Sequence, residues 1–429
     1  MKNKFWPLTS IMLLLSIGAY AQEKKNLSLE EVMQLAYSNS TDAKVLEAKV
    51  KTRQLEYESS KDSRLPEAKL SASYLGLTHP NVDLKIPVAG GSGFGVTPDQ
   101  LFIGQVSANM PLYTGGKISN RIKGAKDSWT AAEFQSIAAK QNLANQAMHM
   151  YIALYKAQQT KELIAENIKK SEQQVADFKA MEQNGVIARN DLLKAELQLS
   201  NYKVAYQESL KNVNTLNYQL AIFLGLPEDT QLEAITLAHL DNTTAIGAVE
   251  DRYEIKSLDA QKDAAEDHLK EVRAAYYPTI VATAGYASLQ VHNLVTVTNA
   301  VNAGVGITYD IGALYKNKKK INVAKQQMEE LDRTRLQTQN SIKNQVHEAR
   351  EEVNLAQEKY KLYQQALVQA KENYRIVKDK YDNGVADTDD LLEADVQQLQ
   401  SKINLAIGDA TIVEKYYDLL LANGQLNLK

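Results

Sequence analysis

The sequence predicts a mainly α-helical protein with a small β part: a rod of long antiparallel coiled-coil helices, and four strands of membrane-spanning length. Three observations predict this class. No proline occurs in 112–226 or 279–429, so long helices are permitted there. Four segments of about ten residues alternate apolar and polar side chains. The order of helix, strands and helices occurs twice along the chain.

Residues 1–21 are predicted to be a secretory signal peptide. The segment has a basic start, a short apolar run at 11–17 and a small-x-small cleavage site at 19–21. A membrane-spanning helix is the alternative interpretation, but the apolar run is too short to cross a bilayer. We therefore expect the mature chain to be exported.

The composition and the motifs give no indication of an enzyme. The chain has 49 basic and 52 acidic residues, a balance that gives no reason to expect a nucleic-acid partner. It has no cysteine, and its 6 histidines are isolated, without the spacing of metal ligands. Motifs of hydrolases, metalloproteases and nucleotide-binding proteins are absent from the sequence. We expect no catalytic residue, no cofactor and no metal site.

An internal repeat organises the mature chain. Asn184–Ala195 reads NGVIARNDLLKA, and Asn383–Ala394, 199 residues further on, reads NGVADTDDLLEA. Such a duplication is common in transport proteins. The predicted units are a first structural repeat at 22–225, an inter-repeat linker at 226–250 and a second structural repeat at 251–429.

Each repeat is predicted to contain a helix, a β-hairpin, a long helix and a final helix. In the first repeat these are Ser28–Ser60, a β-hairpin within 65–113, Lys117–Glu182 and Asn190–Phe223. In the second they are Asp251–Ala275, a β-hairpin within 277–311, Lys316–Tyr381 and Asp389–Leu421. The long helices are rich in good helix formers and would each span roughly 100 Å. Each of them ends at an Asn-Gly turn.

The predicted strands have the period of a sheet with two different faces. Alternation is clearest in Ala300–Ile311, and 68–76, 102–112 and 279–289 follow the same pattern. Such segments, with tyrosines in or beside them, are typical of transmembrane strands and their interfacial aromatic belts. A small soluble sheet that caps a helical bundle is the alternative.

Four strands per chain are too few to close a barrel. A sheet exposed to lipid cannot keep open edges, because nothing there satisfies the unpaired backbone groups. Bacterial barrels begin at about eight strands. The strands therefore predict a ring of identical chains that share one barrel, with two or three copies as the simplest solutions.

Taken together, these features resemble the outer-membrane efflux protein family of TolC-type channels. The resemblance covers almost the whole mature chain. It rests on the opening LSLEEVMQLAYSNS at Leu27–Ser40, on the paired strand hairpins and on two G-V-x-x-x-x-D-L-L-x-A turns, at Gly185–Ala195 and Gly384–Ala394.

The resemblance implies a homotrimer with one shared 12-stranded barrel in the outer membrane of a Gram-negative bacterium. The long helices would continue that barrel as a coiled-coil tunnel through the periplasm. The implied function is the exit duct of a tripartite efflux or type I secretion system. Such a duct passively conducts substrates from an inner-membrane pump, and a periplasmic adaptor (membrane fusion) protein and outer-membrane lipid are its other partners. A non-conducting helical scaffold or adhesin is the alternative function.

The resemblance also assigns an acidic ring to the second turn. Asp390 and Glu393 are three residues apart, so they lie on one face of a helix. By resemblance they line the periplasmic entrance, where rings of carboxylates attract cations. The alternative role is helix initiation, in which acidic residues complement the helix dipole and Asp387 or Thr388 forms the cap.

A tip latch is implied by the same comparison. Asp191 holds the matching place in the first repeat, and the resemblance implies a contact with Tyr381 that helps to hold the tip shut. The family's arginine position is Ala386 here, which is a departure from the pattern. Gly185 and Gly384 are expected at the turns, where a positive φ suits glycine. In the family, these helix-turn tips contact the adaptor.

Overall fold

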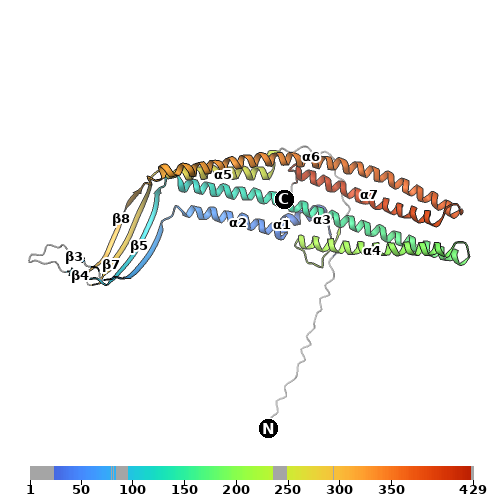
Figure 1. Cartoon of the computed structure of the whole chain (residues 1–429), viewed down its shortest axis with the longest axis horizontal. Helices are drawn as coiled ribbons and strands as arrows, with labels where there is room; N and C mark the ends of the chain where they lie inside the picture. The colour runs from blue at the N-terminus through green and yellow to red at the C-terminus, as the bar shows by residue number, and fades with distance from the viewer. Residues whose placement is uncertain are drawn as a thin grey trace, which may run out of the picture.

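The computed structural model describes residues 24–78, 80, 82–83, 95–234, 249–292 and 294–426. The predicted signal peptide lies outside these residues, as does most of the linker at 226–250. The described chain is a long helical rod with a sheet at one end and two helical hairpins at the other (Figure 1).

The first half of the described chain contains six strands and four α-helices. These are β1 (Lys24–Leu27), α1 (Leu29–Asn39), α2 (Thr41–Asp62), β2 (Glu67–Gly76), β3 (Val82–Asp83), β4 (Gly95–Val96), β5 (Gln100–Tyr113), α3 (Lys117–Gln183), α4 (Arg189–Phe223) and β6 (Gln231–Ala234). The predicted first long helix is thus confirmed as α3, which extends one residue further.

The second half repeats the arrangement. It contains the 3₁₀ turn η1 (Val249–Asp251), α5 (Tyr253–Arg273), the 3₁₀ turn η2 (Ala274–Tyr276), β7 (Thr279–Val291), β8 (Val295–Thr308), α6 (Ala313–Asp382) and α7 (Thr388–Ala422). Among the described residues, no helix combines the length and the apolar character needed to cross a membrane.

The prediction of one continuous helix at Ser28–Ser60 is wrong, because the helix is interrupted at Ser40. Ser40 has an extended ψ of 150°, and its buried hydroxyl accepts a hydrogen bond from the Ala43 amide at 3.1 Å. The same hydroxyl donates to the Ala36 carbonyl at 2.7 Å. One serine therefore satisfies backbone groups of both α1 and α2, which allows the chain to change direction.

The bounds of one predicted strand also need correction. The last strand, expected at 300–311, is β8, which begins five residues earlier and ends at Thr308. A strand pair that the sequence does not indicate is formed by β6, in the linker, and β1, which lie parallel. Each strand of this pair has four residues, too few for a periodic pattern, and the pair is stabilised by burial of Leu27 and Leu232.

The main sheet joins the two repeats. Its strand order is β2-β5-β7-β8, with every neighbouring pair antiparallel, so the hairpin of the first repeat lies beside that of the second. Strands β2 and β8 are the two edges, and neither edge has a partner in the described part of the chain.

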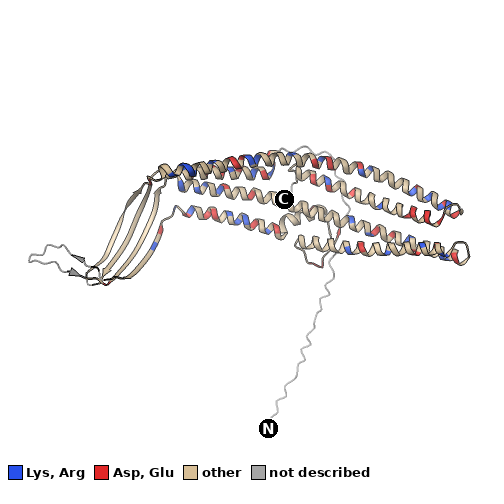
Figure 2. Cartoon of the chain, viewed as in Figure 1, with Lys and Arg blue, Asp and Glu red and all other residues tan. Residues whose placement is uncertain are grey.

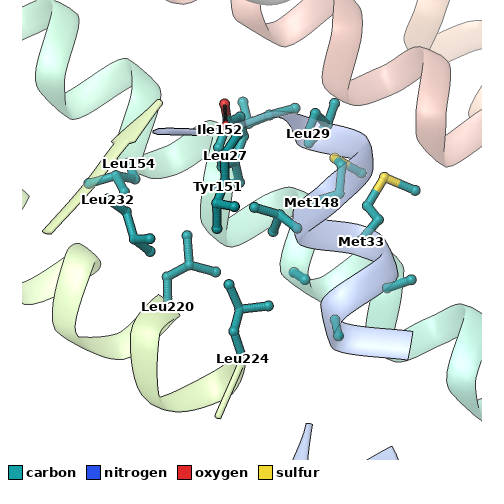
Figure 3. Packing of buried hydrophobic residues seen from close by; sticks show 14 of the residues in the cluster. Leu27, Leu29, Met33, Met148, Tyr151, Ile152, Leu154, Leu220, Leu224 and Leu232 are labelled. Atoms are coloured by element: carbon teal, nitrogen blue, oxygen red, sulfur yellow. Dashed lines mark hydrogen bonds between the residues drawn. The ribbon is translucent and has the colours of Figure 1, made fainter. Parts of the chain in front are cut away.

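The largest hydrophobic core lies in the middle of the rod, where α1, α4 and the β1–β6 pair meet α3 (Figure 3). Tyr151 on α3 is almost completely buried there, and its hydroxyl donates to the Leu27 carbonyl at 2.7 Å. Leu220 and Leu224, from the end of α4, pack in the same cluster. This core attaches the N-terminal segment and the first hairpin to each other.

A charged network joins α3 to α7 close to this core. His149 lies between two carboxylates, with Nδ1 3.1 Å from Glu414 and Nε2 2.9 Å from Asp418. Hydrogen bonds with Asp418 and Glu414 raise the pKa of His149 to about 9. His149 is therefore expected to be protonated at neutral pH, and it links the two repeats at mid-rod.

Candidate functional site at the rod tips

Both hairpins turn with the same backbone geometry. At the first tip Gly185 has a φ of +72°, and the Val186 amide donates to the Met181 carbonyl at 2.9 Å. At the second tip Gly384 also has a φ of +72°, and the Val385 amide donates to the Lys380 carbonyl at 2.8 Å. Each long helix thus ends in a Schellman motif, which requires the left-handed conformation that glycine adopts at little cost.

The acidic residues of the second tip initiate α7. The Asp387 carboxylate accepts a hydrogen bond from the Asp390 amide at 2.9 Å, so Asp387 is the N-cap. Asp390 and Glu393 follow on α7 and are both exposed, and the Glu393 carboxylate accepts a hydrogen bond from Gln397 at 3.0 Å. Acidic residues are concentrated at this end of α7 (Figure 2). Helix initiation accounts for Asp387, and Asp390 and Glu393 remain accessible for a second role.

Tyr381 and Asp191 belong to the same tip region, but no hydrogen bond joins them in the described chain. Instead, the Tyr381 ring stacks on Phe178 with a centroid distance of 5.5 Å. Burial raises the pKa of Tyr381, and the negative charge of Asp191 adds to the effect. Tyr381 therefore contributes packing between the two hairpins, and its contact with Asp191 stays a prediction.

An ion pair that connects the two hairpins lies beside these residues. Lys194 Nζ, on α4, is 2.7 Å from Asp389 Oδ2, on α7. The hydrogen bond to Asp389 raises the pKa of Lys194, so the lysine stays charged at neutral pH. The sequence places Lys194 and Asp389 in corresponding turns, but a contact between them depends on how the two hairpins pack.

The deepest polar site of the tip region is centred on Asp395. This residue is only 2% exposed, and Lys170 Nζ of α3 lies 2.5 Å from its Oδ1. Tyr202 of α4 donates to Oδ2 at 3.0 Å, and Asn167 of α3 donates to the same oxygen at 3.3 Å. Lys170 also lies 3.6 Å from the ring centroid of Tyr374 on α6. The Asp395 carboxylate of α7 thus contacts α3 and α4, and Lys170 extends the site to α6.

Sequence reasoning missed the Asp395 site. Asp395 directly follows the repeated G-V-x-x-x-x-D-L-L-x-A motif, and the first repeat has Glu196 in the matching position. Its three partners, Asn167, Lys170 and Tyr202, are 193 to 228 residues away along the chain, so no local spacing brings them together. The one available signal is an aspartate on the apolar side of a helix, beside the buried Ala394.

The described chain is a sheet joined end-on to a helical rod with two matching tips, and solved outer-membrane channels share this architecture. The family model described as outer membrane efflux protein matches residues 32–226 and 247–425. The chain therefore belongs to the outer membrane efflux protein family. No curated protein sequence matches it significantly.

Solved structures share the fold at low sequence identity. The Campylobacter jejuni CmeC outer membrane channel is 19% identical, with a TM-score of 0.76, over 99% of this chain and 95% of that one. The outer membrane protein VceC from Vibrio cholerae is 17% identical, with a TM-score of 0.75, over 92% and 96%. The open state of the Neisseria gonorrhoeae MtrE outer membrane channel is 18% identical, with a TM-score of 0.71, over 92% and 88%.

Proposed function

We propose that the chain is one of three identical subunits of an outer-membrane exit duct. In this proposal, the four strands of each chain form one third of a barrel in the outer membrane of a Gram-negative bacterium. The helices continue the duct through the periplasm toward an adaptor and an inner-membrane pump, as in a tripartite efflux or type I secretion system. The duct conducts passively, and the pump supplies the energy.

The two faces of the main sheet carry this proposal. Residues that pair directly across its four strands form an apolar row on one face: Leu70, Val106, Tyr286 and Val301. The adjacent row, on the opposite face, is polar or small: Lys69, Ser107, Gly285 and Asn302. Leu70 is 81% exposed and Val301 is 78% exposed. An apolar face against lipid and a polar face against water are what a transmembrane barrel requires.

The open edges support sharing of the barrel between chains. The strands alternate in direction from β2 to β8, so β8 of one copy can pair antiparallel with β2 of the next. Three chains of four strands make twelve, enough for a water-filled lumen, whereas eight strands are largely filled by side chains. Ring closure also satisfies the backbone groups of both edges.

The acidic ring gives the duct an expected ionic preference. Asp390 and Glu393 from three copies would place six carboxylates around the entrance. In planar bilayers we expect a cation-selective current, and we expect Asp390→Asn with Glu393→Gln to lower the cation-to-anion permeability ratio severalfold. The reversal potential in a salt gradient measures this ratio.

A matched variant distinguishes the effect of the ring carboxylates on selectivity from the effect of a changed net charge. Glu56→Gln with Glu58→Gln removes the same charge from α2, far from the tips, and should leave the reversal potential unchanged. If the two double variants behave alike, the ring assignment is wrong. If folded wild-type protein gives no current, the duct itself is contradicted and the scaffold alternative is favoured.

The Lys194–Asp389 pair is expected to help to keep the tip closed. The family's arginine position is Ala386 here, so that cation is absent from the tip. The Lys194–Asp389 pair supplies an ionic contact between the two hairpins in its place. We predict that Lys194→Met raises the mean single-channel conductance severalfold. Single exposed ion pairs are weak, about 0–1 kcal/mol, but three copies act together around one axis.

The control breaks an ion pair within one hairpin. Lys203 on α4 pairs with Glu172 on α3 at 2.9 Å, so Lys203→Met removes a similar exposed lysine without unlinking the two hairpins. This variant should conduct like wild type. Equal conductance in all three proteins would show that the Lys194 pair does not restrain the tip.

A further inference from the structure

A group of unpaired cations surrounds the junction of the sheet and the rod. The basic collar, as we name it, consists of exposed residues at the start of α3 and α6: Lys117, Lys123, Lys316, Lys318, Lys319 and Lys320. The end of α5 joins the two helix starts, since Arg121 of α3 pairs with Glu271 and Asn317 of α6 donates to the Val272 carbonyl. Lysines and arginines are dense at this end of α6 (Figure 2).

Helix stability does not explain the collar. Cations near a helix N-terminus oppose the helix dipole, and acidic residues favour it. The other described α-helices all have an acidic residue in the first turn, whereas α3 and α6 have none. The two helices that begin at the sheet, α3 and α6, thus carry basic residues near their N-termini where the other helices carry acidic ones.

The collar lysines also have no carboxylate partners. In the described part of the chain, none of the six makes an ion pair. Farther along α6 the cations are mixed: Arg333, Lys361, Arg375 and Lys378 make ion pairs, and the described contacts of Lys359 and Lys371 include none. The charge of the collar is therefore available to an external anionic partner.

Exposed tyrosines place that partner at a membrane surface. Tyr277, Tyr309 and Tyr315 lie between the apolar strands and the collar, and Tyr315 is 70% exposed. Lys316 Nζ lies 5.8 Å from the Tyr315 ring centroid. The sequence of layers, from apolar strands through tyrosines to lysines, matches that of a bilayer from acyl chains to headgroups.

We propose that the basic collar binds the phosphate headgroups of anionic phospholipids in the leaflet that faces the helices. This inference rests on the proposed membrane position of the sheet. The lysines supply point charges that complement phosphodiesters, and the tyrosines pack at the level of the glycerol groups. Binding there fixes the depth of the barrel in the membrane.

The test counts lipids on the intact complex. Detergent-purified protein is mixed with phosphatidylglycerol or phosphatidylcholine, and native mass spectrometry measures the lipid retained. We expect wild type to prefer phosphatidylglycerol by about tenfold, and the triple variant Lys318→Gln, Lys319→Gln, Lys320→Gln to lose most of that preference. The control triple variant Lys359→Gln, Lys361→Gln, Lys371→Gln, on the exposed rod part of α6, should keep it.

Three results would overturn the inference. One is that wild type retains phosphatidylglycerol and phosphatidylcholine equally. Another is that both triple variants lose the preference for phosphatidylglycerol to the same extent. The third is a collar variant that falls apart into single chains, because the lysines would then bind a neighbouring copy instead of lipid. Planar-bilayer current from the same preparations distinguishes this inference from the proposed function. If wild type conducts current but shows no preference for phosphatidylglycerol, lipid binding by the collar is wrong and the proposed duct is unaffected.

Discussion

Replacing Asp395 with alanine is expected to destabilise the protein by about 3–5 kcal/mol, because it leaves the partly buried Lys170 cation without its carboxylate. Tyr202 and Asn167, both buried, lose their acceptor at the same time. These residues come from both hairpins, so the loss weakens the packing of one hairpin on the other near the tips. Thermal or denaturant unfolding followed by circular dichroism measures the effect.

Two further variants test why Asp395 matters. Asp389→Ala removes an exposed aspartate from the same helix, and loss of its solvent-screened ion pair with Lys194 should leave the free energy of unfolding nearly unchanged. Combining Asp395→Leu with Lys170→Met removes both charges and should recover most of the stability lost by Asp395→Ala. If Asp395→Ala and Asp389→Ala cost the same, the buried carboxylate does not hold the hairpins together.

Gly115→Ala is expected to cost about 2–5 kcal/mol, combining left-handed strain with a steric clash. Gly115 has a φ of +61° in the connection from β5 to α3. A Cβ atom there would lie 2.5 Å from the Tyr277 Cβ and 3.0 Å from the Ala274 carbonyl oxygen. Both of these atoms are held by the backbone at the end of α5, so the junction between sheet and rod must shift.

The neighbouring glycine is the matched control. Gly116 also has a positive φ, of +86°, but a Cβ atom there would meet nothing closer than the Asn120 amide nitrogen at 3.4 Å. Gly116→Ala should therefore cost only the backbone strain, about 1–2 kcal/mol. Thermal unfolding of the two variants gives the difference directly, and equal destabilisation would contradict the predicted clash.

The sequence predicts those features whose cause is local or periodic. The long helices follow from proline placement and good helix formers, and α3 and α6 lie within three residues of their predicted bounds. The tips follow from Asn-Gly, since glycine adopts the required φ of +72°. The strands follow from the alternation of apolar and polar side chains, which is typical of a sheet with two unlike faces.

Features that depend on packing between distant segments could not be predicted. The break at Ser40 depends on the burial of its hydroxyl, and the β1–β6 pair on two short segments about 200 residues apart. The site around Asp395 and the Lys194–Asp389 pair require the orientation of one hairpin against the other. Sequence periodicity identifies the face of a helix but not the residue that it meets.

The claim that the open sheet is completed by two further copies can be tested by crosslinking of its edges. The chain has no cysteine, so an engineered pair is unambiguous. Ser71→Cys in β2 is combined with Ala300→Cys, Asn302→Cys or Gly304→Cys in β8, which covers neighbouring registers on one face. Within one chain these edges are separated by two strands, roughly 14 Å, beyond the reach of a disulfide. After oxidation of the membrane-inserted protein, we expect a ladder on denaturing gels that ends at three chains. A ladder that ends at two chains, or no crosslink at any register, would contradict the shared barrel.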